Sequence, residues 1–125
     1  MAFSESADPH LTLRRIERQH ALIEALRSRR GEPATATRLA QDLGVTTRTV
    51  ERDIERLRHS GIPIAVRRGP GGGYAFDARS SIEPIALDPG EVAALVVSLV
   101  ALGPTATESA RTGMRKLLAA LVTQN

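Results

Sequence analysis

The sequence contains no cysteine, which excludes disulfides, thiolate metal sites and thiol catalysis, and which fits a reducing cytosol. Aromatic residues make up only 2% of the chain, and they are Phe3, Tyr74 and Phe76. A hydrophobic core must therefore be built from leucine, isoleucine, valine and alanine. Stacking platforms for single-stranded nucleic acid are not expected.

The chain is also too short for a large two-domain enzyme. Its 125 residues correspond to one ordinary domain with an appendage. Residues 1–10 carry two acidic residues, no Lys or Arg and no apolar run. We therefore expect a flexible tail at residues 1–10 and no secretory signal.

Patterns that carry catalytic or metal chemistry are missing as well. His10, His20 and His59 share no metal-binding spacing, and no Ser-His-Asp or paired-carboxylate arrangement is present. The glycine-rich segment at 69–73 lacks the Lys and the hydroxyl of a Walker phosphate loop. We expect no catalytic residue, no metal and no cofactor, so the protein is not expected to be an enzyme.

Positive charge is present, but it is confined to one part of the chain. Residues 11–68 hold 13 Arg against seven acidic residues, whereas residues 78–125 hold four basic and four acidic residues. A basic segment of this kind can bind a polyanion through counterion release, or it can be a solvated surface. The choice between these two depends on where the arginines lie.

Three helices are predicted within the basic segment. Apolar residues recur at helical spacing over residues 11–30. A short second helix is predicted between the N-cap Thr35 and Gly44. The third helix begins after the N-cap Thr46 and runs to about Ser60. A glycine follows the predicted end of each helix, where a left-handed backbone is often needed.

The third helix separates into two chemical faces when its residues are placed about 100° apart. One narrow stripe is apolar and consists of Val50, Ile54 and Leu57. The opposite side is basic and carries Arg48, Arg52, Arg56 and His59. We expect the helix to bury the apolar stripe and to present guanidinium groups on its other side.

After Gly61 the apolar period changes from about 3.6 residues to 2, which predicts a two-stranded hairpin over residues 62–76. Pro63 indicates that the first strand lies at an edge or begins there. The glycine-rich tip is expected not to pack, and Tyr74 and Phe76 are expected to face the hairpin core.

This order of elements predicts a mostly α fold of the α+β class. We expect a winged helix-turn-helix with a two-stranded wing at residues 11–79, and a linker with a C-terminal helical hairpin at residues 80–125. A helix of this kind fits the major groove of B-DNA, where Arg reads guanine through two hydrogen bonds.

The predicted contacts with double-stranded DNA fall into two sets. Arg48 and Arg52, helped by Thr47 and Thr49, are expected to read base edges. The phosphate backbone is expected to be held by a second set, Thr46, Arg56, Arg67 and Arg68.

The segment LAQDLGVTTRTVERDIERL at residues 39–57, followed by Gly61 and by RGPGGGY at residues 68–74, resembles the N-terminal DNA-binding domain of DeoR-type regulators of the WYL-domain family. The resemblance spans residues 11–78. It implies a bacterial, cytoplasmic transcription regulator that joins the nucleoid when it is bound to DNA.

The resemblance also concerns the end of the chain. It implies that residues 88–124 correspond to the helical segment that leads to a ligand-sensing WYL domain in that family. Because the sequence ends at Asn125, we expect that sensing domain to be absent.

Two further helices are predicted in the C-terminal part. Asp88 caps the first of them, with Pro89 in its first position and Glu91 completing a capping box. Residues 92–102 are apolar except for one serine, but 11 residues are too few for a membrane span, which needs about 20. No membrane partner is expected.

A helix that is apolar nearly all round should be buried. Thr105 and Glu108 predict a capping box for a second helix, whose apolar stripe could cover part of the first: Ala110, Met114, Leu117, Leu118 and Leu121. We expect a second subunit to cover the rest. The sequence thus predicts a homodimer through residues 88–121 that reads two half-sites about 34 Å apart.

Two other functions fit the same sequence. In one, the winged helix is an interaction module whose third helix docks a protein partner, and binding is independent of salt. In the other, the chain is the detached N-terminal regulatory domain of a larger protein, which predicts a catalytic domain encoded downstream.

Overall fold

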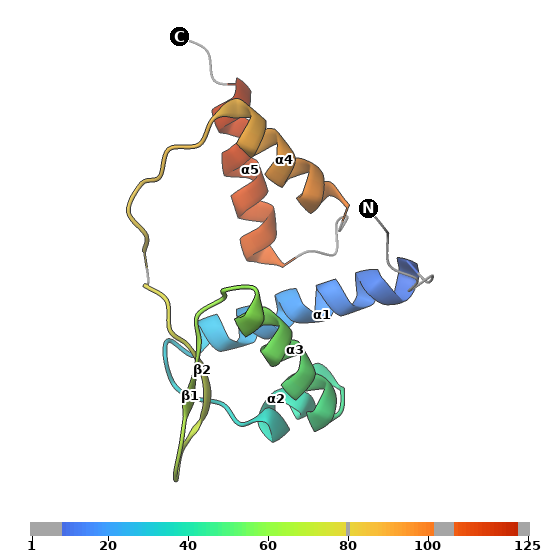
Figure 1. Ribbon diagram of the computed structural model, residues 1–125, viewed down its shortest axis with the longest axis vertical. Helices are drawn as coiled ribbons and strands as arrows, with labels where there is room; N and C mark the ends of the chain where they lie inside the picture. The colour runs from blue at the N-terminus through green and yellow to red at the C-terminus, as the bar shows by residue number, and fades with distance from the viewer. Residues whose placement is uncertain (1–8, 80, 102–106, 123–125) are drawn as a thin grey trace. The chain divides into compact units, whose positions relative to one another are not determined.

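The computed structural model describes residues 9–79, 81–101 and 107–122. These residues form five helices and two strands, in the order α1 (Pro9–Ser28), α2 (Ala36–Leu43), α3 (Thr47–His59), β1 (Ile64–Arg67), β2 (Gly73–Phe76), α4 (Pro89–Val100) and α5 (Glu108–Val122) (Figure 1). The chain divides into one unit at Arg18–Ser81, which we call the winged unit, and a second unit that contains the remaining residues.

Helix α1 begins two residues earlier than predicted and ends at Ser28. Pro9 and His10 are helical, and the rest of the predicted tail, residues 1–8, lies outside the described residues. Proline is tolerated in a first helical turn, because the N–H that it lacks would have no helical partner there.

Short-range caps define α2 and α3 as predicted. The hydroxyl of Thr35 accepts a hydrogen bond from the amide three residues on (3.1 Å), and Gly44 ends α2 with a φ of 70°. The hydroxyl of Thr46 accepts the equivalent bond at the start of α3 (3.1 Å). Only three residues therefore separate two capped helices, which is the geometry of a helix-turn-helix.

The strands β1 and β2 pair antiparallel, and β1 begins directly after Pro63. Ala34, which precedes α2, bridges to Tyr74 of β2 through two backbone hydrogen bonds of 2.8 and 2.9 Å. Because Ala34 pairs with β2, β1 lies at the edge of the described sheet. Pro63, which has no N–H to donate to a neighbouring strand, is tolerated directly before such an edge strand.

The expectation that the glycine-rich tip does not pack is wrong at two positions. A Cβ atom at Gly73 would lie 2.4 Å from the carbonyl oxygen of Ala34, and φ at Gly73 is 139°. A Cβ atom at Gly72 would lie 2.2 Å from the carbonyl oxygen of Arg67. Gly73 thereby permits close backbone approach between the hairpin and the segment before α2, whereas Gly72 permits a tight turn within the hairpin itself.

The winged unit buries one core that contains no aromatic residue among its buried members: Leu22, Leu26, Ala34, Leu39, Ala40, Val50, Ile54, Leu57 and Ile64. Tyr74 and Phe76 pack against it partly buried, so the predicted apolar stripe of α3 and the predicted hairpin core are both confirmed. The fold is a winged helix-turn-helix with β1 and β2 as its wing, followed by helices, as the sequence predicted.

In the second unit, α4 begins with the predicted capping box. The Asp88 carboxylate accepts a hydrogen bond from the Glu91 amide (2.8 Å), and the Glu91 carboxylate accepts one from the Asp88 amide (2.8 Å). The predicted cap of α5, Thr105, lies outside the described residues. At the observed start of α5, the hydroxyl of Thr107 accepts a hydrogen bond from the amide of Ala110 (3.3 Å).

Burial of α4 by its own chain is slight. Val92 is its one buried residue among those described, whereas Leu95, Val97 and Val100 are 47%, 69% and 60% exposed. Helix α5 packs against α4 but covers only part of it, and no residue of α5 is fully buried. The near-complete burial predicted for an apolar helix is therefore not reached within the described part of one chain.

Candidate nucleic-acid interface

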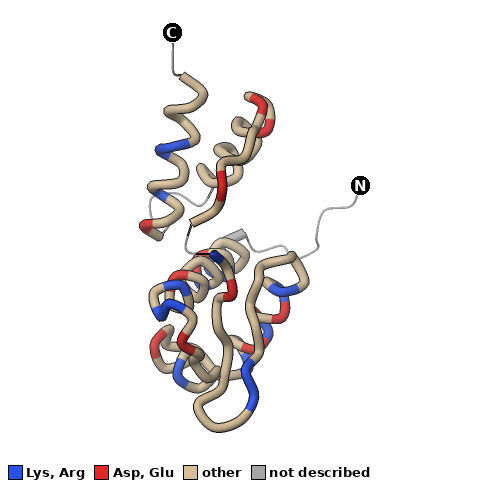
Figure 2. Tube along the Cα trace, turned by 90° about the vertical axis from the view of Figure 1, so that its left-hand side faces the viewer, with Lys and Arg blue, Asp and Glu red and all other residues tan. Residues whose placement is uncertain are grey.

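The exposed side of α3 carries two arginines in its first two turns. Arg48 and Arg52 lie four residues apart, and both are exposed. No hydrogen bond or ion pair joins either side chain to another described residue. Each guanidinium therefore offers its full fork of N–H donors to a partner outside the chain. Figure 2 shows further basic positions, in blue, on the helices and the hairpin of the winged unit.

The threonines at the start of α3 are less available than the arginines. Thr47 and Thr49 are half-buried. The exposed Thr46 hydroxyl accepts a hydrogen bond from the Thr49 amide and donates one to the Thr49 hydroxyl (3.0 Å). What this helix start offers to an anion is consequently its remaining backbone N–H groups and the positive end of its dipole.

A buried carboxylate on α3 joins this helix to α1. Asp53 is 1% exposed, and Arg18 donates two hydrogen bonds to it, from Nε to Oδ2 and from Nη2 to Oδ1 (3.1 Å). Gln19 Nε2 also donates to Oδ1 (3.3 Å). No buried side-chain polar atom of the described residues lacks a hydrogen-bond partner. The carboxylate is thus satisfied in an otherwise apolar region, as a buried charge must be.

The hydrogen bond to Asp53 raises the pKa of the Arg18 guanidinium above its ordinary value, against the opposing effect of burial. A group whose pKa is raised by folding stabilises the fold fully below its unfolded pKa and loses that contribution only as pH rises through the folded value. For an arginine this loss falls at strongly alkaline pH. The contribution of Arg18 to the stability of the fold is therefore constant through neutral pH.

Sequence reasoning missed Asp53, although a signal was present. Asp53 lies three residues after Val50 and four before Leu57, so helical spacing already places it beside the apolar stripe. An acidic residue at such a position must find a buried partner. The partner, 35 residues earlier in the chain, could not be identified from spacing.

Arg56, a predicted backbone contact, takes part in the same cluster. Its Nη1 lies 3.6 Å from Asp53 Oδ1, and its side chain is 51% exposed. The structure therefore places Arg56 between the buried carboxylate and solvent, whereas Arg48 and Arg52 are free of such contacts. Its role as a phosphate contact stays a prediction.

The wing contributes two exposed arginines. Arg67 is the last residue of β1, and Arg68 follows it directly. A groove of about 390 Å³ lies between the hairpin, the start of α2 and α3, and both Arg67 of the wing and Glu51 of α3 line it. The structure thus brings Arg67 and α3 to one groove, while Arg68 is outside its lining.

Comparison with known proteins gives a match for this part of the chain. A protein-family model described as an HTH domain matches residues 18–75. The matched residues have the helix-turn-helix fold described above. The matched segment contains all eight predicted contact residues, and it extends from Arg18 of the buried ion pair to Ala75 of the wing. No solved structure matches the chain.

The helix-turn-helix match supports a DNA-binding role in transcription regulation, and domains of this kind are typically not enzymes. In residues 9–79, 81–101 and 107–122, no helix has the length and apolarity needed to cross a membrane. The same residues contain no group of three His, Asp or Glu side chains placed to hold a metal ion.

Proposed function

We propose that the protein binds specific sequences of double-stranded DNA and regulates transcription, as a DeoR-type regulator of the WYL-domain family in the bacterial cytoplasm and nucleoid. The observation that carries the proposal is the two-sided chemistry of α3. One side is buried in the core, and the other presents Arg48 and Arg52 without a described partner. A helix of this kind enters the major groove and reads guanine edges through arginine forks.

Within this proposal the contact residues have two roles. Arg48 and Arg52 read base edges, and the adjacent Thr47 and Thr49 assist them. The second set fixes the position of the protein on the backbone through charge and helix-start amides, and consists of Thr46, Arg56, Arg67 and Arg68.

Selection of bound fragments from a pool of random duplex DNA tests this function most directly. A recurring sequence should be enriched, and affinity for it should fall steeply as salt concentration rises. No enrichment, together with a protein partner whose binding is insensitive to salt, would contradict DNA binding and favour the interaction module.

We further propose that the protein is a homodimer through residues 88–121. Four large apolar residues of α4 and α5 in this part are exposed in the single chain: Leu95, Val97, Val100 and Leu118. A second copy presents the same apolar surface, so a two-fold contact covers both copies at once. In such a dimer, the two α3 helices bind two DNA half-sites about 34 Å apart.

Sedimentation equilibrium and the selected DNA sequence test the dimer together. We expect a dimer at micromolar concentration and an inverted repeat in the selected DNA. A monomer that binds a single unrepeated site would contradict the dimer and leave the proposal of DNA binding intact.

A further inference from the structure

A second basic feature lies away from α3. The end of α1, the segment after it, one residue of each wing strand and the segment after β2 line a cavity of about 700 Å³, and none of its lining residues belongs to α3. Sites for small ligands commonly have volumes of about 300–1,000 Å³. All lining residues belong to the winged unit. The cavity is thus of the right size for a ligand and lies within one unit.

The charges around this cavity are mostly positive. Four arginines line it, at positions 27, 30, 67 and 79, against one acidic residue, Asp77. Phe76 adds an aromatic wall. A concave site with this excess of guanidinium groups concentrates anions, because low-dielectric walls strengthen the local field.

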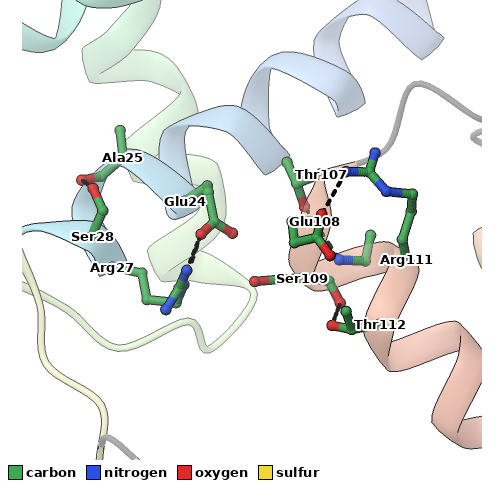
Figure 3. Close-up of polar contacts among 10 residues, drawn as sticks. Glu24, Ala25, Arg27, Ser28, Thr107, Glu108, Ser109, Arg111 and Thr112 are labelled. Carbon is green, nitrogen blue, oxygen red and sulfur yellow. Dashed lines mark hydrogen bonds and ion pairs between the residues drawn. The ribbon is translucent and has the colours of Figure 1, made fainter.

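The four arginines differ in whether their side chains already bond to other residues of the protein. Arg27 donates to the Glu24 carboxylate, next to the bond from the Ser28 hydroxyl to the Ala25 carbonyl (Figure 3). In contrast, no hydrogen bond or ion pair joins the side chain of Arg30 or Arg67 to another described residue. These two guanidinium groups are available for a ligand.

The backbone of Arg30 gives an independent reason to assign a function to this cavity. Its φ is 53°, and Arg30 is the only non-glycine residue of the described chain with a positive φ. A side chain with a Cβ atom is disfavoured in this left-handed region, where glycine or asparagine is common. A left-handed backbone is common just after a helix, but here an arginine holds a position that glycine or asparagine usually fills, so a charged side chain is kept at the edge of the cavity.

We propose that this cavity is an anion site that binds a phosphate group, held by the guanidinium groups of Arg30 and Arg67. Two guanidinium forks match the oxygens of a phosphate, and the charge-assisted hydrogen bonds they form are stronger than neutral ones. The phosphate belongs either to a small phosphorylated molecule or to a DNA backbone that continues past the wing. Arg67 is also one of the proposed DNA contacts, so the site shares one residue with the DNA-binding function proposed above, whereas Arg30 belongs to this cavity and not to the proposed DNA contacts.

Titration of the full-length ¹⁵N-labelled protein with sodium pyrophosphate, at constant ionic strength, tests the site. The amide signals of Gly31 and Ala78, which line the cavity, should shift and saturate. Arg30→Gly should weaken this binding about tenfold, because it removes a charged donor. The same change suits the backbone, since glycine adopts the positive φ of position 30 without strain.

Two controls keep loss of folding apart from loss of binding. Thermal unfolding should show Arg30→Gly to be at least as stable as the wild type, and Arg30→Asn, which also tolerates this backbone, should lose pyrophosphate binding to a similar extent. Arg14→Gln removes an exposed arginine of α1 that does not line the cavity, and it should leave pyrophosphate affinity unchanged.

A DNA titration of the same variants separates the two sources of phosphate. If the backbone is the source, Arg30→Gly should weaken binding to all sequences and lower the salt slope by about one. If a small molecule is the source, the DNA salt slope should stay as in the wild type while pyrophosphate binding falls. Equal pyrophosphate affinity and equal salt slopes in wild type and Arg30→Gly would overturn the proposal.

Discussion

The winged unit and the α4–α5 pair place their apolar side chains in opposite ways. The winged unit buries nine apolar residues in one core and exposes arginines, whereas the α4–α5 pair buries only Val92 among its described residues and exposes valines and leucines. The charge follows the same division, since the excess of Arg lies in residues 11–68 and residues 78–125 are balanced. A charged exterior over a complete core suits a polyanion, while an apolar exterior suits association with another protein surface.

The comparison predicts a large difference in the cost of removing an apolar side chain. Leu26→Ala, at a fully buried position, should lower the free energy of unfolding by about 3 kcal/mol through lost burial and a residual cavity. Val97→Ala, at a position that is 69% exposed, should change it by less than about 0.5 kcal/mol in the monomer. Urea denaturation at low protein concentration, followed by circular dichroism, measures both. Similar losses in the two variants would remove the distinction between the regions.

The buried ion pair is the next most sensitive position. Asp53→Ala leaves the Arg18 guanidinium, one quarter exposed, without its carboxylate, and should cost about 2 kcal/mol of unfolding free energy. The matched control is Asp42→Ala, which breaks an exposed pair with Arg38 (3.2 Å) and should cost less than about 0.5 kcal/mol. Should both aspartates give the same small loss in urea titrations, Asp53 would not join α1 to α3 as the structure indicates.

Asp53 also shows which parts of the fold were accessible from the sequence. The caps at Thr35, Thr46 and Asp88 depend on contacts across three residues, so local patterns predicted them correctly. The Arg18–Asp53 pair joins residues 35 apart, and its formation depends on how two helices pack. Spacing along one helix carries no information about such a partner.

The same limit applies to the candidate interfaces. The exposed side of α3 was predictable, because a spacing of about 100° per residue places Arg48 and Arg52 on the side of the helix opposite the apolar stripe. The contact of Arg56 with Asp53 and the cavity around Arg30 were missed, since each depends on segments that meet only in the folded unit. The close approach of Gly73 to Ala34 was missed for the same reason.

If the charged exterior of the winged unit reads DNA, one α3 arginine should dominate the choice of sequence. Arg52→Ala should cost about 1–3 kcal/mol on the selected duplex and relax preference at one base pair. The control Arg58→Ala removes an exposed arginine from another side of the same helix and should leave base preference unchanged. Fluorescence anisotropy with single-base variants of the duplex measures both. Unchanged preference in Arg52→Ala would refute the base-reading role.

The apolar exterior of α4 should matter for association and not for the fold of one chain. Val97→Ser keeps a similar helix propensity but removes an exposed apolar group, and it should raise the Kd of dimerisation about tenfold. Sedimentation equilibrium measures the Kd, and Leu26→Ala cannot serve as its control because it affects the core. Ser98→Ala, on the same helix, is the better control, since the Ser98 hydroxyl bonds only to the Ala94 carbonyl of its own helix among the described contacts. If neither variant changed the Kd of dimerisation, the exposed apolar surface of α4 would belong to a contact with another partner.

The smallest expected effect comes from removing one exposed arginine from each of the two regions. Arg68→Ala in the wing should weaken binding to every DNA sequence about fivefold and lower the salt slope by about one, because one phosphate contact and its released counterion are lost. Arg115→Ala on α5 removes an exposed arginine from the region of balanced charge and should leave the salt slope unchanged. The slopes are obtained from anisotropy titrations of non-specific duplex at several salt concentrations. If both variants lowered the slope equally, DNA affinity would depend on total charge, and the position of the arginines in the wing would carry no function of its own.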